Sequence, residues 1–505
     1  MQTVRVRGVC LQGLEAILVT VEARFEPIDR QRTEVVISGL PDPVIRESRG
    51  RLLAALDENR LHVPQGRLFV NLAPAGEKKS GEALDLPLAL GAAAACGHID
   101  PRALEGTLFL GELGIDGRLL DVPGGLAAAD ACRTAGLARM VAPPATAREA
   151  ACVPGPTVFE AENLARVVHW VATGNGLASP RVDAAPADPA PHATSLDDVR
   201  GQGTAKRALA AAAAGGHGVL FSGPPGAGKS LLARGLRGLL APPSWEERLA
   251  ITRIQAAAGL WNGSLASERP FRSPHPTTSV AGLVGGGPSA LPGELTLAHG
   301  GLLFLDELAE FKRDALEALR VPLETGTMHL SRANRRVALP ARFHLVAATN
   351  PCPCGFRGTP GRICRCSSAE VARYRRRISG PLLDRIELRV EIAPPSVEEL
   401  ARPVAQELAE ASLRRAVESA RDRMRARQGD VENARLSPEA LDRFAPLTPS
   451  LRAFLERASQ RRGLSARALQ SLRALARTLA DLEGSPAVRE EHAAEALALR
   501  APLFD

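Results

Sequence analysis

The chain contains few aromatic residues and very few lysines. Aromatics make up 3% of its 505 residues, with one tyrosine and three tryptophans. A row of base-stacking rings is therefore not expected, and any nucleic acid would be bound mainly through its phosphates. Lysine occurs only five times, at positions 78, 79, 206, 229 and 312, whereas arginine and alanine are abundant. A lysine inside a motif is thus informative in this chain.

Long apolar runs are also missing. No stretch of 18 apolar residues occurs, which excludes a membrane-spanning helix. The N-terminus lacks the basic segment, apolar core and small-residue cleavage site of a signal peptide. We therefore expect a cytoplasmic protein, whose thiols stay reduced and whose clustered cysteines indicate metal more often than disulfides.

The length and apolar content of the chain predict a globular protein of two to four domains. Its net charge of +7 makes an anionic partner plausible. Arginine-rich helical stretches such as 412–430 have a simpler interpretation, because charged helix faces are usually just solvated.

Periodicity predicts three domains and a linker. Residues 1–170 alternate strand-like and helix-like segments, as in an α+β domain. Residues 171–195 are rich in proline, alanine and glycine, and we interpret them as a linker. Residues 196–395 show the alternation of a doubly wound α/β domain, and residues 396–505 are predicted to be all-helical.

A phosphate-binding loop is the strongest motif of the chain. The apolar strand at 219–221 leads into the sequence GPPGAGKS and then into a helix, the context that the G-x-x-x-x-G-K-[ST] motif requires. Its backbone N–H groups would surround the phosphates of ATP, with Lys229 on the β- and γ-phosphates and Ser230 on Mg²⁺. The predicted ATP-binding residues are Gly223, Pro224, Pro225, Gly226, Ala227, Gly228, Lys229 and Ser230.

Two further strands end in polar residues that fit this site. The apolar segment 302–305 is followed by Asp306 and Glu307. Ligands of open α/β sheets bind at the carboxyl ends of the strands, so Asp306 would complete the Mg²⁺ shell and Glu307 would polarise the attacking water. The strand at 343–350 ends in Asn350, whose amide could orient that water.

Two arginines are candidates for stabilising transition-state charge. Arg385 follows a short helix before a strand, from where it could reach the nucleotide of a neighbouring subunit; a surface salt bridge is the alternative. Arg467 opens a helix of the C-terminal region and could reach the γ-phosphate within its own chain.

Residues 325–343 predict a β-hairpin with a basic tip. Two short strands flank a turn with Arg332, Asn334, Arg335 and Arg336. In a ring these arginines would face the channel and bind DNA phosphates; a solvated basic hairpin is the alternative. The glycine-rich segment 284–294 could form a second loop on the same side.

Four of the eight cysteines lie within seventeen residues. They form two C-x-C pairs directly after Asn350, at Cys352, Cys354, Cys364 and Cys366. Four thiolates without an interleaved histidine or carboxylate predict a structural, non-catalytic Zn²⁺ site. Unliganded thiols and a redox switch are the alternatives. Cys10, Cys96, Cys132 and Cys152 stand singly in apolar contexts and read as core residues.

The order of these motifs resembles that of AAA+ ATPases. With the segments RPFRSPHPTTSVAGLVGGG and PGELTLAHGGLLFLDEL, the chain resembles over its whole length the Mg-chelatase-like AAA+ family known as YifB or ComM, in its cysteine-bearing branch. The resemblance implies a Lon-protease-like N-terminal domain, a hexameric ring, and a DNA helicase for branch migration during homologous recombination and natural transformation. It also assigns Lys229 and Ser230 to the phosphate loop, Asp306 and Glu307 to the acidic pair, Asn350 and Arg467 to the sensors, and Arg385 to the arginine finger.

Two departures from the family pattern limit what is carried over. Pro274-His275-Pro276 stands where the family has a second histidine, so no role is given to that position. Residues 78–83 read KKSGEA in place of KKEGSA, and segment 111–125, which corresponds to the lysine-bearing segment of Lon proteases, has no lysine. A serine–lysine protease needs both groups, so the first domain is expected to be a scaffold or nucleic-acid-binding module.

Two other functions remain open at this stage. One is a chelatase-type ATPase that drives metal insertion into a tetrapyrrole, and the other is an ATP-dependent protein-remodelling scaffold. The basic hairpin disfavours the first. The scarcity of aromatic residues disfavours the second, because an aromatic pore loop would be expected there.

Overall fold

The computed structural model describes residues 3–28, 33–76, 79, 81–181, 194–286, 291–332 and 335–501. Contacts divide the chain into two compact units. The first is Met1–Pro186 together with Arg248–Ala266, and the second is Ala187–Glu247 together with Ser267–Asp505. Among the described residues, no helix combines the length and the apolar character needed to cross a bilayer.

The first unit is built on a mixed seven-stranded sheet. Its centre is antiparallel, while the strands toward both edges pair in parallel. In spatial order the strands are β3 (Glu34–Ser38), β4 (Arg67–Ala73), β2 (Glu15–Glu26), β1 (Val4–Gln12), β5 (Thr107–Phe109), β8 (Arg139–Ala142) and β9 (Thr157–Glu160). A separate ribbon pairs β6 (Glu112–Leu113) with β7 (Leu119–Leu120).

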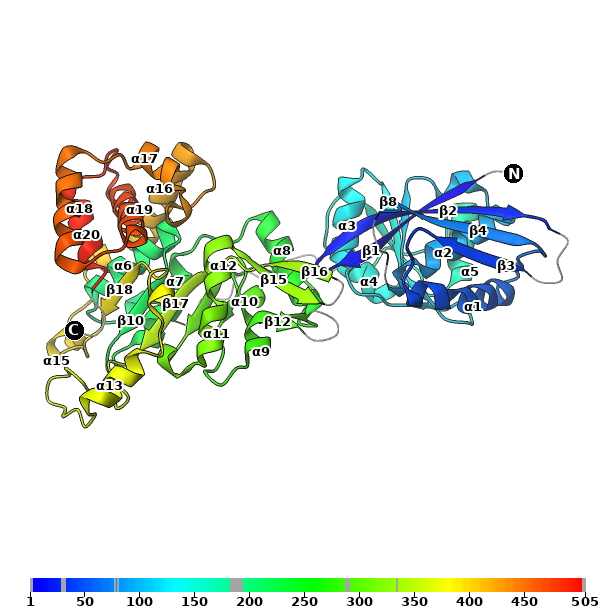
Figure 1. Cartoon of the computed structure of the whole chain (residues 1–505). Coiled ribbons are helices and arrows are strands. Elements are labelled where there is room, and N and C mark those ends of the chain that lie inside the picture. The colour runs from blue at the N-terminus through cyan, green and yellow to red at the C-terminus, as the bar shows by residue number, and fades with distance from the viewer. Residues whose placement is uncertain are drawn as a thin grey trace. The chain divides into compact units, whose positions relative to one another are not determined.

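Alternate residues of these strands belong to two different cores. Phe109 and Val141 pack into one, and their neighbours Leu108 and Met140 pack into the other, as expected for a two-residue period. The first core contains α1 (Pro43–Glu58), α2 (Asp85–Ala95) and α5 (Leu164–Thr173); the second contains α3 (Gly125–Thr134) and α4 (Pro144–Ala150) (Figure 1). Helices therefore cover both faces of the sheet.

The second unit contains a five-stranded sheet in which all strands are parallel. The spatial order is β11 (Phe271–Arg272), β14 (Leu302–Leu305), β17 (His344–Thr349), β10 (Val219–Ser222) and β18 (Leu388–Glu391). Every residue of β10 and β14 is buried, because helices pack on both faces. This confirms the predicted doubly wound α/β core.

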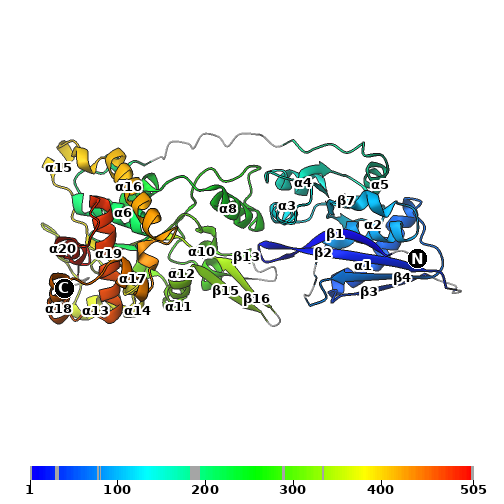
Figure 2. The same cartoon turned by 90° about the horizontal axis from the view of Figure 1, so that it is seen from above.

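Short helices and two ribbons surround this sheet. The ribbons β12 (Gly285–Gly286)–β13 (Leu291–Pro292) and β15 (Thr327–Arg332)–β16 (Arg335–Pro340) are antiparallel and lie on the same side of the core in Figures 1 and 2. The helices are α6 (Gly203–Gly215), α7 (Lys229–Leu239), α9 (Val280–Val284), α10 (Glu294–Leu297), α11 (Arg313–Ala318), α12 (Arg320–Thr325), α13 (Ser368–Arg375) and α14 (Gly380–Leu383). Most of α8 (Trp245–Ala257) groups with the first unit.

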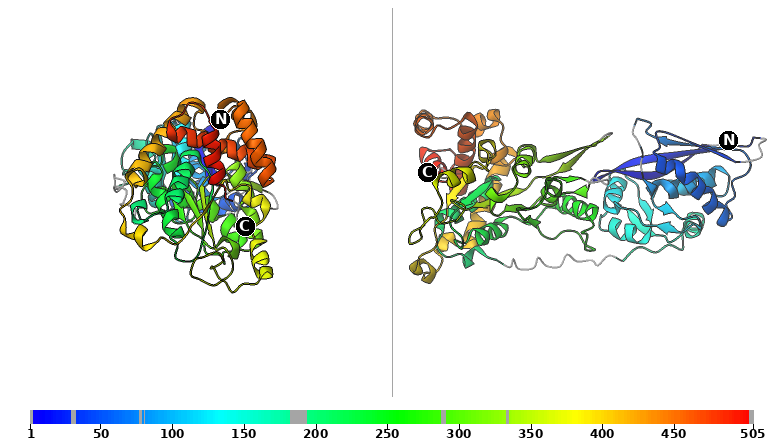
Figure 3. Two further views of the ribbon diagram at one scale, coloured as in Figure 1. Left: turned by 90° about the vertical axis from the view of Figure 1, so that its left-hand side faces the viewer. Right: turned by 60° about the horizontal axis from the view of Figure 1, so that its bottom comes forward.

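The C-terminal region is helical, as predicted, and shares one hydrophobic core with the sheet. Its two longest helices, α16 and α19, both pack against α6, and the group is drawn in orange to red in Figure 3. Its helices are α15 (Val397–Ala401), α16 (Glu410–Gln428), α17 (Pro438–Phe444), α18 (Pro449–Arg462), α19 (Ala466–Glu483) and α20 (Glu490–Ala498). The division into three domains stays a prediction, since residues 248–266 group with the first unit.

Candidate nucleotide-binding site

The phosphate loop joins β10 to α7 and depends on its three glycines. Gly226 and Gly228 have φ values of +78° and +89°, a left-handed conformation that is strained for residues with a Cβ. Gly223 has a different constraint, because a Cβ there would overlap the carbonyl oxygen of Ile392. The loop backbone can therefore turn its N–H groups inward at the N-terminus of α7.

Lys229 is buried and its ammonium group contacts neutral oxygens. Nζ donates to the carbonyl oxygens of Gly223 at 2.6 Å and Pro224 at 2.9 Å, and to Oδ1 of Asn350 at 3.1 Å. Burial lowers its pKa, against the opposing effect of the Asp306 and Glu307 carboxylates. The structure thus brings together the predicted loop lysine and the predicted sensor asparagine.

The acidic pair lies at the carboxyl end of β14, next to the phosphate loop. Ser230 Oγ donates to Asp306 Oδ2 at 3.1 Å, and the backbone N–H of Glu307 donates to Asp306 Oδ1 at 2.9 Å. Glu307 is exposed and has a φ of +49°, an uncommon conformation for a residue with a side chain. A hydroxyl beside a carboxylate fits Mg²⁺, which prefers oxygen ligands.

The four clustered cysteines lie close enough together to share one ion. Their Sγ atoms are all within 4.8 Å of one another, and Cys352 is fully buried. The separations of Cys352 from Cys354 and Cys364 are 3.4 and 3.7 Å, and that of Cys354 from Cys364 is 3.6 Å. A tetrahedron with Zn–S bonds of about 2.3 Å has edges of about 3.8 Å, so the donor set fits zinc.

The cysteine segment packs directly on the phosphate loop. Gly355 has a φ of +83°, and a Cβ at this position would lie 2.7 Å from Cδ of Pro225 and 3.9 Å from Cγ of Asn350. The backbone N–H groups of Phe356 and Arg365 donate to the Cys354 thiol and lower its pKa to about 6. A metal ion bound by these thiols would therefore also fix the position of Gly355, which contacts the phosphate loop.

The two candidate arginines lie together, and both contact Glu324. Arg385 Nη2 is 2.7 Å from Glu324 Oε2, and Arg467 Nη1 is 3.4 Å from Glu324 Oε1. All three side chains line a cavity of about 390 Å³. Among the described residues, no hydrogen bond joins either arginine to the phosphate loop. The expectation that Arg467 acts on the nucleotide of its own chain stays a prediction.

Comparison with known proteins bears on the whole chain. Models of the magnesium chelatase subunit ChlI match residues 26–146 and 195–400, and a model of the ChlI C-terminal region matches residues 408–500. YifB of Salmonella typhimurium is 37% identical over 496 residues, which is 97% of this chain and 95% of YifB. The competence protein ComM of Haemophilus influenzae is 37% identical over 497 residues, which is 97% of this chain and 96% of ComM.

The chain belongs to the YifB/ComM family of magnesium-chelatase-like AAA+ ATPases. The resemblance inferred from the motifs is thereby confirmed, as is the fold class of an AAA+ core with a helical C-terminal region.

The predicted hairpin is present as β15 and β16. Arg332 pairs with Arg335 across the ribbon, and Ser331 pairs with Arg336. The side chains of 331–336 and the turn residue Asn334 lie outside the described part of the structure, so the predicted DNA contacts of Arg332, Arg335 and Arg336 stay predictions. Segment 284–294 contains the ribbon β12–β13 in its described residues.

The expected lack of proteolytic activity in the first unit stays a prediction. Lys79 is fully buried, and its ammonium group donates to the carbonyl oxygen of Pro74. The segment 111–125 forms the ribbon β6–β7 and the start of α3. Ser80 and Lys78 lie outside the described residues.

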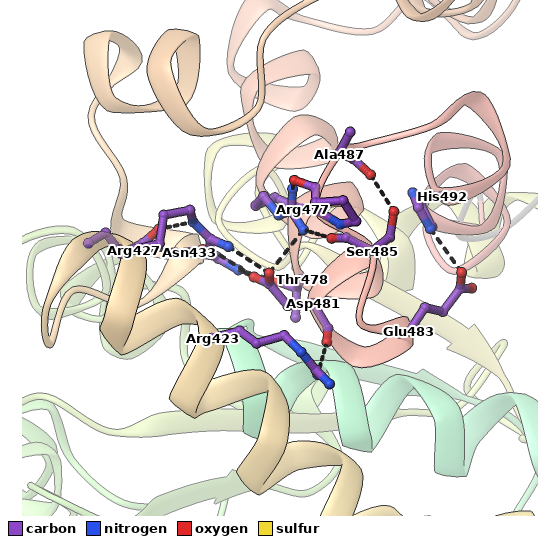
Figure 4. Close-up of polar contacts among 12 residues, drawn as sticks. Arg423, Arg427, Asn433, Arg477, Thr478, Asp481, Glu483, Ser485, Ala487 and His492 are labelled. Atoms are coloured by element: carbon purple, nitrogen blue, oxygen red, sulfur yellow. Dashed lines mark hydrogen bonds and ion pairs between the residues drawn. The ribbon is translucent and has the colours of Figure 1, made fainter.

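A buried polar network in the C-terminal region was not predicted from the sequence (Figure 4). Asp481 of α19 accepts from both terminal nitrogens of Arg427, at 2.6 and 2.8 Å, and from Arg477 at 3.0 Å. Thr478, one turn earlier, is 2.8 Å from Nε2 of His217, and burial lowers the pKa of this histidine to about 3. These contacts join α19, whose second residue is Arg467, to α16 and to the end of α6.

Glu324 is the functional candidate that sequence reasoning missed. It is a glutamate near the end of a short helix and belongs to no motif. The only available signal was its place just before the predicted hairpin.

Proposed function

We propose that this protein is a ring-forming ATPase, a hexamer, that couples ATP hydrolysis to DNA translocation. In this proposal it acts in the cytoplasm as a branch-migration helicase in homologous recombination, including natural transformation. The ATPase part rests mainly on one observation, the convergence of Lys229 with Asn350 and of Ser230 with Asp306 at one edge of the sheet.

The residues of this edge have distinct tasks in the proposal. Lys229 exchanges the carbonyl oxygens of Gly223 and Pro224 for oxygens of the β- and γ-phosphates. Ser230 and Asp306 hold Mg²⁺, which neutralises phosphate charge when bound. Glu307 polarises the attacking water, and its exposed position leaves it accessible for this task. Asn350 orients the same water while it holds the lysine.

The arginines act on the nucleotide of a neighbouring copy. Arg385 and Arg467 share one carboxylate and one cavity, so we assign them a joint role in trans, in place of a same-chain role for Arg467. An arginine that contacts the γ-phosphate of the next subunit stabilises transition-state charge and makes hydrolysis depend on assembly. This requirement is the basis for the ring.

DNA is the proposed substrate of the motor. The hairpin β15–β16 carries Arg332 at the end of β15 and Arg335 and Arg336 at the start of β16, and it lies beside the ribbon β12–β13. Arginines at the tip of a ribbon suit phosphate contacts, which provide affinity without sequence preference. The name of the Haemophilus relative, a competence protein, supports this direction.

The four cysteines are proposed to hold one structural Zn²⁺. Bound zinc would cross-link Cys352, Cys354, Cys364 and Cys366 and leave no coordination position for a substrate. Because Gly355 contacts Pro225, the clamp would fix the segment that leaves Asn350 against the phosphate loop.

A second candidate is metal insertion into a tetrapyrrole. The names of the matching family models, all of the magnesium chelatase subunit ChlI, favour it. That reaction would leave ATP hydrolysis indifferent to DNA, so the same assay separates the two candidates.

The test is the ATPase rate with and without forked or four-way DNA at two salt concentrations. The proposal predicts stimulation by DNA that weakens at the higher salt, because phosphate contacts release counterions. Equal rates in all arms, together with no salt-dependent DNA binding, would reject the DNA motor.

A further inference from the structure

The contact of Glu324 with both candidate arginines has no assigned role in ATP hydrolysis. Each oxygen of the carboxylate meets one guanidinium group, Oε2 that of Arg385 and Oε1 that of Arg467. The Arg385 contact is the largest cause of the lowered pKa of Glu324. The Glu324 carboxylate is therefore paired with the two guanidinium groups that must contact a phosphate in the proposed mechanism.

The arginines keep capacity for a second anion. One carboxylate faces two guanidinium groups, so the trio has a net positive charge. The side chain of Arg385 is only 11% exposed. Its Nε is buried and has no hydrogen-bond partner among the described residues. An unpaired buried donor is costly, and a phosphate oxygen would satisfy it. Glu324 itself is 51% exposed and can leave without the loss of a buried environment.

The backbone around Glu324 leads directly into the hairpin. Glu324 is the next-to-last residue of α12, and β15 begins three residues later at Thr327. Between them, Gly326 has a φ of +71° and accepts from the N–H of Ala341 at 2.8 Å, just after the end of β16. The start of β15 and the end of β16 thus both lie close to Glu324.

Side-chain contacts connect the residues around Gly326. A Cβ at this glycine would lie 3.3 Å from Nη1 of Arg435, which lines the same cavity. Thr325 Oγ1 lies 3.0 Å from the Val321 carbonyl oxygen and 3.0 Å from Thr327 Oγ1, and so ties the last turn of α12 to the first residue of β15. These contacts connect the residue after Glu324 to the base of the hairpin.

We propose that Glu324 is the positioning residue that links the nucleotide of a second copy of this chain to the hairpin β15–β16. Its carboxylate competes with the terminal phosphate of that nucleotide for Arg385 and Arg467. When the phosphate takes the arginines, Glu324 is released and the hairpin base shifts. This inference rests on the proposed function, because it assumes arginines that act in trans.

The test compares Glu324→Gln with the wild type and with Glu317→Gln. Glutamine keeps the shape and removes the charge. Glu317 is a matched control. It lies on α11, the helix before that of Glu324, and its carboxylate is 2.8 Å from Nη1 of Arg320, but it does not line the cavity. The measurements are kcat and KM for ATP, each with and without four-way DNA, and a melting curve for every variant.

We expect Glu324→Gln to raise the DNA-free kcat and to lower the stimulation by DNA about fivefold, within the usual range of coupling between sites. The KM for ATP should stay close to that of the wild type, since the phosphate loop is untouched. Glu324→Asp should lie between the two, and Glu317→Gln should behave as the wild type. If Glu324→Gln does not fold, the same comparison is made with Glu324→Asp.

An unchanged DNA-free kcat in a folded variant, with wild-type stimulation, would overturn the inference. A wild type that hydrolyses ATP but ignores DNA would instead reject the proposed DNA motor. In that case a raised DNA-free kcat in Glu324→Gln would still support the competition for the arginines, and an unchanged one would refute it.

Discussion

The protein has two clusters whose cationic side chains are candidates for binding the phosphates of ATP, and the partners of these side chains differ. Lys229 contacts two carbonyl oxygens and an amide oxygen, all neutral, while Arg385 and Arg467 contact the carboxylate of Glu324. Neutral partners are exchanged for a phosphate at small electrostatic cost. A charged partner must be displaced, so a phosphate that binds to the arginines changes the position of the Glu324 carboxylate. The first cluster is therefore suited to binding ATP, and the second to transmitting the presence of the nucleotide to Glu324.

The largest expected effect is at the neutral-partner cluster. Lys229→Ala should lower ATP hydrolysis by about a thousandfold or more, because it removes the positive charge that contacts the β- and γ-phosphates. Steady-state ATPase assays and nucleotide binding measure this. Lys312→Ala serves as the control, because Lys312 is exposed and outside the site. Substantial activity in Lys229→Ala would remove the basis for the comparison.

The next effect concerns the charged-partner cluster. Arg385→Ala should reduce kcat about 10²- to 10³-fold, the usual loss for a group that stabilises transition-state charge. The KM for ATP should change little, because binding depends on the other cluster. A rise in KM with an unchanged kcat would assign Arg385 to ground-state binding and contradict the division between the clusters.

The cysteine segment lies on the neutral-partner side and should have a smaller effect. The double substitution Cys352→Ser and Cys364→Ser should lose about one zinc per chain, by the stoichiometry of a four-thiolate site. Stimulation by DNA should fall about tenfold while basal hydrolysis changes less, a typical size for altered coupling. Metal analysis and ATPase assays test this, and wild-type protein without zinc would refute the metal site.

The smallest expected effect is at the hairpin next to Glu324. Removal of one phosphate contact, for example by Arg336→Ala, lowers the salt slope of DNA binding by about 0.9. Between 50 and 200 mM salt this corresponds to about a threefold smaller loss of affinity. Fluorescence anisotropy with labelled DNA measures the slope. An unchanged slope in the triple substitution of Arg332, Arg335 and Arg336 to alanine would exclude the hairpin from DNA binding.

The sequence predicted the neutral-partner cluster well, for a physical reason. Asp306 and Asn350 follow short apolar runs that are typical of buried parallel strands, and the carboxyl ends of such strands meet at one edge. The hairpin was also predictable, because two short strand-like segments follow each other closely in the sequence, and they pair in the structure. Both conclusions follow from local pattern.

The charged-partner cluster could not be predicted in the same way. Glu324, Arg385 and Arg467 are distant in sequence, and each occupies a helix end whose neighbours depend on tertiary packing. The same limit applies to residues 248–266, whose helical pattern does not reveal that they group with the first unit. The network around Asp481 likewise required the packing of α16 against α19.

The central claim is that one copy supplies the phosphate loop and another supplies the arginines. Its most direct test is a mixture of two inactive proteins, Lys229→Ala and Arg385→Ala, followed by an ATPase assay. A shared site predicts that the mixture regains activity, because the intact loop of one variant meets the intact Arg385 of the other. A mixture as inactive as its components, in conditions where the wild type assembles and hydrolyses ATP, would contradict the claim.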